Sequence, residues 1–242
     1  ACYFILEISS TLRARQQALF TGQAAHLLAR VHWLDSLQPA GFRGIVLGNE
    51  LLDAMPVERF RVSTDGIEQL QVGWEENRFS WRAARAQDAL RDRVTALGLA
   101  EGYVSETGLA AEGWVRSVAD VLEQGVLLLV DYGFPRHEFY HPQRASGTLM
   151  CHYRHRAHAD PLLFVGLQDI TAHVDFTAIA MAGTESGLGL LGYTSQALFL
   201  LGCGLEGLAA RVDPADARAH LRFTNEVKKL TLPHEMGELF KV

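Results

Sequence analysis

The chain has 242 residues, a formal net charge of −6 and 48% hydrophobic residues, enough for one large domain or one domain with a sizeable insertion. The acidic balance and the lack of any Lys/Arg run argue against nucleic acid as the main partner, because phosphate binding needs a basic face. Three cysteines without metal-type spacing indicate a reducing compartment rather than a disulfide framework.

The first quarter of the chain predicts strands that alternate with helices. Residues 3–8 form an apolar run ending near Glu7, and Ser9-Ser10 can cap the helix that follows. Residues 31–33 and 44–47 read as two more strands, and the second leads directly into Asn49-Glu50. Three strand-then-helix units predict a parallel sheet.

An antiparallel insertion is expected over residues 57–124. Apolar and polar residues alternate from Val57 to Trp81, with hairpin turns at Asp65-Gly66 and Glu76-Asn77. Residues 87–97 and 109–122 then have helical apolar spacing. We therefore expect residues 1–56 to begin a core domain that residues 125–242 complete.

The last part of the chain opens with the apolar run Val126–Val130, a predicted central strand that stops at Asp131-Tyr132-Gly133. Residues 134–161 are rich in His, Arg and Pro, and we expect a long ordered loop that acts as a lid or binding loop. Further helices are expected to open at residues 169–176 and 195–201. The apolar stretch 188–208 is too broken by polar residues to predict a membrane span.

Several sequence blocks, in order, resemble the MidA-like family. The blocks are Glu7-Ile8-Ser9, residues 49–57 (NELLDAMPV), Asp131-Tyr132-Gly133, Gly147-Thr148-Leu149, residues 169–176 (DITAHVDF), Gln196 with Phe199-Leu200, and residues 233–242 (PHEMGELFKV). Members are S-adenosylmethionine-dependent methyltransferases related to the mitochondrial factor that methylates an arginine of a respiratory complex I subunit. The resemblance implies a Rossmann-like α/β fold, with a mostly parallel sheet, helices on both faces and an antiparallel insertion.

The resemblance also assigns cofactor residues. Glu7, with Ile8 and Ser9, would bind the ribose of S-adenosylmethionine, as acidic residues at strand ends do in dinucleotide enzymes. Trp33 would face the adenine, and Asn49 would lie near the transferred methyl group. Two structural alternatives stay open: Glu7 as a carboxylate that only favours the helix after it, and Trp33 as a packed indole.

Catalysis is assigned to Asn49, Glu50 and Asp53. Two carboxylates can hold a guanidinium bidentately and accept the proton released on methylation. Glu50 and Asp53 would form such a pair if the segment turns helically. The alternative for Asp53, which the residue types favour, is an ordinary turn residue before Pro56.

Substrate contacts are expected from Asp131, Tyr132, His155 and His158. A strand-end Asp131 that caps the next segment is an equal possibility, and the histidines can be ordinary loop residues. Their spacing does not favour a metal site, so we expect none. No Gly-x-Ser-x-Gly elbow is present to support a hydrolase.

The family's glycine-rich loop and first strand, which precede the Glu7 strand, have no counterpart in the sequence. We expect a carboxyl-terminal portion of a longer protein, unstable and unable to bind cofactor alone, with an opening in the sheet between the strands of Glu7 and Asn49. The predicted partner is an arginine-bearing protein, with a homodimer possible, in the bacterial cytoplasm or the mitochondrial matrix. A non-catalytic assembly protein with the same fold is the alternative, and a nicotinamide oxidoreductase ranks last because it gives Asn49-Glu50 no role.

Overall fold

A computed structural model describes residues 2–37, 39–213 and 215–242. Its central sheet is built on β3 (Phe42–Asn49) and β8 (Leu122–Phe134), which run parallel, with Asn49 opposite Val130. The far end of β8 also pairs with β12 (Val174–Asp175), parallel, and with β13 (Phe240–Lys241), antiparallel. The backbones of β3 and β8 approach so closely at Gly125 that a Cβ there would lie 1.8 Å from the Gly44 carbonyl oxygen.

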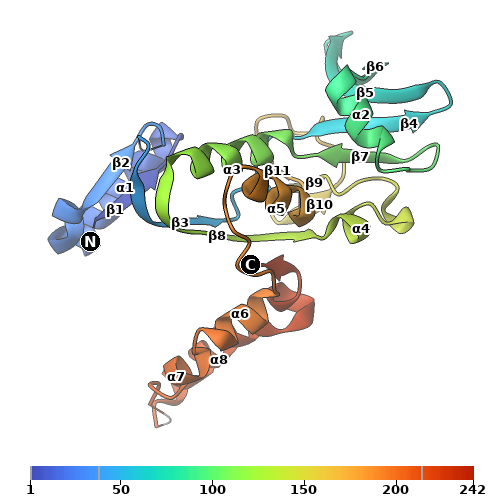
Figure 1. Ribbon diagram of the computed structural model, residues 1–242. Helices are drawn as coiled ribbons and strands as arrows, with labels where there is room; N and C mark the ends of the chain where they lie inside the picture. The colour runs from blue at the N-terminus through green and yellow to red at the C-terminus, as the bar shows by residue number, and fades with distance from the viewer. Residues whose placement is uncertain (1, 38, 214) are drawn as a thin grey trace.

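A second, two-stranded sheet contains β1 (Tyr3–Leu6) and β2 (Val31–Leu34), which are parallel and connected by α1 (Ser10–Gln23) and the 3-10 helix η1 (Ala25–Arg30). This unit lies at one end of the molecule (Figure 1). As expected, Ser9 caps α1, and its hydroxyl accepts the Leu12 N–H. Within the described residues no ladder joins β1 to β3, and Leu6, Ile45 and Leu47 of these strands are exposed.

Helices α3 (Leu109–Val121) and α5 (Phe176–Glu185) pack on each other and on the central sheet. Their apolar faces form one core with residues of the β3–β8 layer and of the segment after β3; its buried members include Leu52, Val115, Val174, Phe176 and Ile179. The α/β fold with a parallel sheet and an added antiparallel sheet, expected from the sequence, is confirmed.

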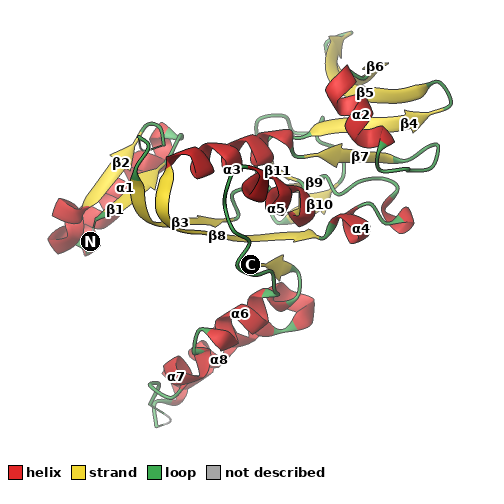
Figure 2. Ribbon diagram, viewed as in Figure 1, coloured by secondary structure: helices red, strands yellow, loops and turns green. Residues whose placement is uncertain are grey.

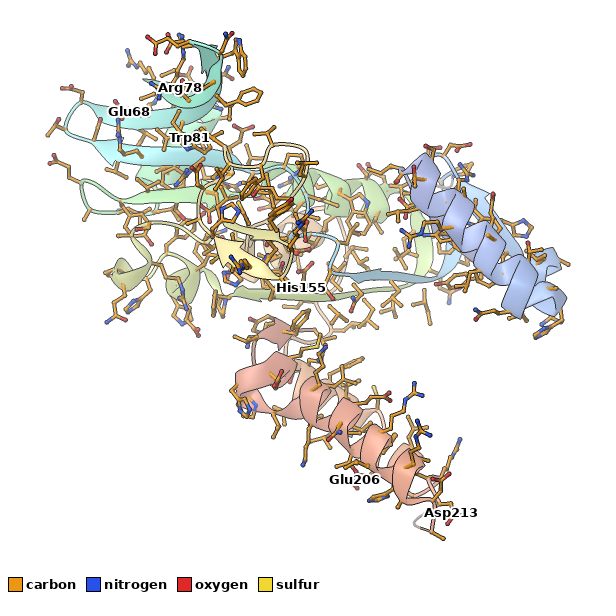
Figure 3. All side chains as sticks on the ribbon, turned by 180° about the vertical axis from the view of Figure 1, so that it is seen from behind. Glu68, Arg78, Trp81, His155, Glu206 and Asp213 are labelled. Atoms are coloured by element: carbon orange, nitrogen blue, oxygen red, sulfur yellow. The ribbon has the colours of Figure 1, made fainter. Side chains whose placement is uncertain are left out.

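The antiparallel sheet has the order β6-β5-β4-β7 and stands at the opposite end of the molecule from β1 and β2 (Figures 1 and 2). Its strands are β4 (Glu58–Ser63), β5 (Gly66–Glu75), β6 (Arg78–Arg85) and β7 (Val104–Thr107). Both predicted hairpin turns are present, whereas β7 was not predicted. Glu68, Arg78 and Trp81 mark this sheet in Figure 3, and α2 (Asp88–Thr95) packs beside it.

The prediction of one long loop over residues 134–161 is wrong. The segment contains α4 (Arg136–Phe139), the 3-10 turn η2 (Pro142–Arg144), β9 (Met150–Tyr153) and β10 (Arg156–His158). The prediction of a helix opening at residue 169 is also wrong. Asp169–Thr171 is β11, which pairs with β9, and α5 begins only at Phe176, where Asp175 accepts the Ala178 N–H at 3.1 Å.

The end of the chain forms a helical arm that projects from the body (Figure 1). It consists of α6 (Gln196–Gly202), α7 (Leu205–Ala209) and α8 (Ala217–Thr231), and the π-turn η3 (Pro233–Gly237) leads back to β13. The helix expected near residues 195–201 is confirmed, while α8 was not predicted. Among the described residues, no helix is both long and apolar enough to cross a membrane.

Candidate active site

Glu7 lies immediately after β1, at the start of α1, and its carboxylate is held in a fixed orientation. One oxygen accepts the Ser9 N–H at 2.8 Å, and the other accepts the Gln16 side-chain amide at 3.1 Å. The other end of the Gln16 amide accepts the Trp33 indole N–H at 3.0 Å. The chain Glu7–Gln16–Trp33 therefore connects the ends of β1 and β2 through one side chain of α1.

The predicted cofactor residues around Glu7 differ in exposure. The Ile8 side chain is 95% exposed, so it is left accessible by the described part of the chain. Ser9 uses its hydroxyl to cap α1 and its N–H to hold Glu7. Trp33 is partly buried and packs edge-on against Phe20, with ring centroids 5.8 Å apart. The structural roles considered for Glu7 and Trp33 are thus both present in the fold.

Asn49 and Glu50 lie where β3 ends, and both side chains are exposed. The Asn49 amide donates to the Glu50 carboxylate at 3.3 Å, and the Glu50 N–H donates to the Val130 carbonyl at 2.9 Å. Glu50 has φ 47°, a left-handed conformation that is uncommon for a residue with a side chain. The backbone reverses at Glu50 and leaves its carboxylate at the surface.

The helical carboxylate pair expected from Glu50 and Asp53 is not formed. The left-handed backbone at Glu50 prevents a helical turn, and Asp53 is only 4% exposed. The Asp53 carboxylate accepts the hydroxyl of Tyr132 from the end of β8, and its other oxygen, Oδ1, is buried without a hydrogen-bond partner in the described structure. The buried Asp53 therefore binds the partly buried Tyr132, whereas Glu50 is exposed.

Asp131 is 1% exposed and points into the turn that follows β3. Its Oδ2 accepts the backbone N–H groups of Leu51, Leu52 and Asp53 at 3.1, 2.9 and 3.3 Å, and its Oδ1 accepts the Tyr132 N–H at 2.9 Å. Burial and the nearby Asp53 charge raise the pKa of Asp131 to about 6, although the N–H donors favour the charged form. The capping role that the sequence left open for Asp131 is the one that the structure shows.

His173 belongs to the sequence block at residues 169–176, but the sequence assigned it no role. Its ring packs edge-on against Tyr132 and Phe134 at centroid distances of 5.3 and 5.2 Å. Burial, with a smaller effect of the Arg144 charge, lowers its pKa to about 4 and keeps the ring neutral near pH 7. Its backbone N–H donates to Thr148, whose hydroxyl and N–H bind the buried Glu106 of β7. The sequence block that contains His173 does not reveal these contacts, because its neighbours come from segments far apart in sequence.

His155 and His158 lie on the small β9–β10–β11 sheet. His155 occupies the turn between β9 and β10 with φ 63°, in the central part of the molecule (Figure 3). His158 accepts the Asp160 N–H at 3.4 Å and lies 6.0 Å from the Phe164 ring. No hydrogen bond connects either histidine to Glu50 in the part of the chain that the structure describes. Over the same residues, no three His, Cys, Asp or Glu side chains gather as a metal site would require.

Comparison with known proteins places the chain in a family. A family model described as "Putative S-adenosyl-L-methionine-dependent methyltransferase" matches residues 1–194. The chain belongs to this family. The resemblance stated from the sequence is thereby confirmed.

Two curated members are similar to the chain. The protein arginine methyltransferase NDUFAF7 homolog, mitochondrial, of Drosophila melanogaster is 28% identical over 216 residues, covering 84% of this chain and 47% of the relative. Protein arginine methyltransferase NDUFAF7, mitochondrial, of Danio rerio is 28% identical over 222 residues, covering 87% of this chain and 49% of the relative. The chain thus spans about half the length of these relatives.

Solved structures show the same fold. A COG1565 superfamily member from Burkholderia thailandensis, crystallised with S-adenosyl-homocysteine, is 49% identical and superimposes with a TM-score of 0.94 over 99% of this chain and 62% of that chain. A native crystal structure of a COG1565 protein from the same organism gives a TM-score of 0.95 at 49% identity, over 99% of this chain and 64% of that chain. The family's cofactor is therefore S-adenosyl-L-methionine.

Proposed function

We propose that the protein is an S-adenosylmethionine-dependent methyltransferase that modifies arginine in a protein substrate. The observation that carries this proposal is the exposed Asn49–Glu50 pair at the end of β3, where ligands of open α/β sheets bind. The names of the curated relatives support arginine as the acceptor and a protein as the partner.

The residues after β1 fit the adenosyl part of the cofactor. Glu7 presents a partly exposed carboxylate that is fixed by Ser9 and Gln16, and a ribose diol needs such an acceptor. The exposed apolar side chain of Ile8 and the aromatic ring of Trp33 could both contact the adenosyl group. When bound, the cofactor supplies an electrophilic methyl group on a sulfonium.

The residues after β3 would handle the methyl acceptor. Glu50 would bind the guanidinium through charge-assisted hydrogen bonds and accept the proton released when the nitrogen is methylated. Asn49 would orient the guanidinium beside the methyl group, since its amide already contacts Glu50 at 3.3 Å. Asp53, being buried, would act through Tyr132 and not by direct contact.

Glu50→Gln in the protein at its full natural length should abolish methyl transfer while S-adenosylhomocysteine affinity stays within a few fold. The assay measures transfer from tritiated S-adenosylmethionine to total protein from cells lacking the gene, with methylarginine identified by mass spectrometry. Glu58→Gln, on β4, is the matched control and should keep activity. Full turnover by Glu50→Gln would remove Glu50 from the mechanism.

Isothermal titration with S-adenosylhomocysteine separates this proposal from a non-catalytic assembly protein, because an enzyme must bind the cofactor saturably. We propose an arginine of a respiratory complex I subunit as the substrate, because the sequence resemblance implies it. The relatives are named as mitochondrial, which supports a mitochondrial compartment in a eukaryote. We propose the matrix there and the cytoplasm in a bacterium. Comparing methylarginine across the proteome with and without the gene tests this assignment.

A further inference from the structure

The turn after β3 is held by one buried carboxylate from a neighbouring strand. The backbone N–H groups of Leu51, Leu52 and Asp53 all point to Oδ2 of Asp131 at 2.9–3.3 Å, and no other acceptor receives them among the described residues. Hydrogen bonds to an ionised acceptor are roughly twice as strong as neutral ones. Three of them on one oxygen determine the path of the turn.

This turn carries an unfavourable backbone conformation. Glu50 has φ 47°, and such left-handed geometry persists at a residue with a side chain only where its surroundings enforce it. The Val130 carbonyl fixes the residue from one side by accepting the Glu50 N–H, and Asp131 fixes the next three residues from the other. Together, adjacent residues of β8 define where Glu50 lies.

The far side of the turn is anchored as well, which limits how it can relax. The Asp53 carbonyl accepts the Ala172 N–H at 3.0 Å, and Leu52 is buried in the core with Val115 and Ile179. A change at Asp131 would therefore shift the Glu50 end of the turn, because the Leu52–Asp53 end has independent contacts.

We propose that Asp131 is a positioning residue for methyl transfer: its carboxylate binds the N–H groups of residues 51–53 and thereby keeps the Glu50 carboxylate aimed at the acceptor. Asp131 itself touches neither cofactor nor substrate. The inference rests on the proposed role of Glu50, and it explains why a fully buried acid lies in β8 directly after Val130, the last residue of this strand that pairs with β3.

The test combines amide hydrogen exchange with kinetics in Asp131→Asn, a variant of nearly the same shape. Asparagine lacks the negative charge, and its NH2 group cannot accept the backbone N–H groups that one carboxylate oxygen accepted. Amide exchange at residues 51–53 should therefore speed up about 10-fold to 100-fold. The amides of Val126–Leu129 in β8 should stay protected. The kcat for methyl transfer should fall about 100-fold, with KM and S-adenosylhomocysteine affinity within a few fold.

The matched control is Asp175→Asn, which alters another strand-end carboxylate, one that caps α5 and pairs with Arg136 at 3.0 Å. It should leave exchange at residues 51–53 and kcat unchanged.

Unchanged exchange at residues 51–53 in Asp131→Asn would overturn the proposal, as would an equal fall of kcat in Asp175→Asn. If Asp131→Asn does not fold, exchange in the wild-type protein decides: these three amides should be as slow as those of β8, and fast exchange would refute the anchoring. Full activity of Glu50→Gln would instead defeat the proposed function, and the positioning role with it, even with the amides protected.

Discussion

Acidification should destabilise the protein through His173. Burial, with Arg144 second, lowers the pKa of this histidine from 6.5 to about 4 in the folded state. The unfolded state therefore binds more protons between these two values, so the stabilising contribution is complete above the unfolded pKa and is lost as the pH falls toward the folded one. By linkage, the loss of unfolding free energy is about 2 kcal/mol at pH 5 and about 3 kcal/mol at pH 4.

His173→Gln removes the titrating ring and keeps a polar side chain. Urea unfolding of both proteins at pH 8 and pH 5 gives the difference in unfolding free energy, and acidification should move it by about 2 kcal/mol in favour of the variant. Asp131→Asn is a control with the opposite pH dependence. Burial raises the pKa of Asp131 to about 6, so the contribution of Asp131 to the unfolding free energy is lost as the pH rises. If the difference in unfolding free energy between wild type and His173→Gln is the same at pH 8 and pH 5, the His173 ring is not held neutral by burial.

Two further variants test the cofactor end of the site and the attachment of the antiparallel sheet. Glu7→Gln should weaken S-adenosylhomocysteine binding by about 10-fold to 100-fold in calorimetry, and unchanged affinity would exclude the ribose role. Arg93→Ala should lower the unfolding free energy by about 3 kcal/mol in urea, because it removes the 2.5 Å ion pair with the buried Glu112. The surface variant Arg91→Ala should leave stability nearly unchanged, and equal effects of the two would contradict a buried ion pair.

The elements that the sequence predicted correctly are those with a local cause. The apolar runs of β1, β3 and β8 and the hairpin turns at Asp65-Gly66 and Glu76-Asn77 each depend on neighbouring residues. The short strands β7, β9 and β11 depend on partners elsewhere in the chain, and three or four residues carry too little periodicity to reveal them. Asp169–Thr171 is three residues long and lies just before α5, so the sequence did not separate this strand from the helix.

The site divides in the same way. Glu7, Asn49 and Glu50 could be found because each follows directly on a predicted strand. The pairing of Tyr132 with Asp53 could not, since the two lie 79 residues apart and meet only when β3 and β8 align. The sequence predicted that Asp131 lies at the end of a strand. It did not predict that the Asp131 carboxylate accepts the backbone N–H groups of the turn after β3.

The acidic residues of this site are either exposed or buried, and this difference decides which of them can bind the methyl acceptor. Glu50 is exposed and accepts only the weak Asn49 contact at 3.3 Å, so a guanidinium can bind it without displacing a strong internal bond. Asp131 and Asp53 are buried, and their carboxylates already accept hydrogen bonds from backbone N–H groups and from the Tyr132 hydroxyl, so a cation would have to reach them below the surface. Under the proposed function, the methyl acceptor should therefore meet one carboxylate at this turn, that of Glu50, which Asp131 positions.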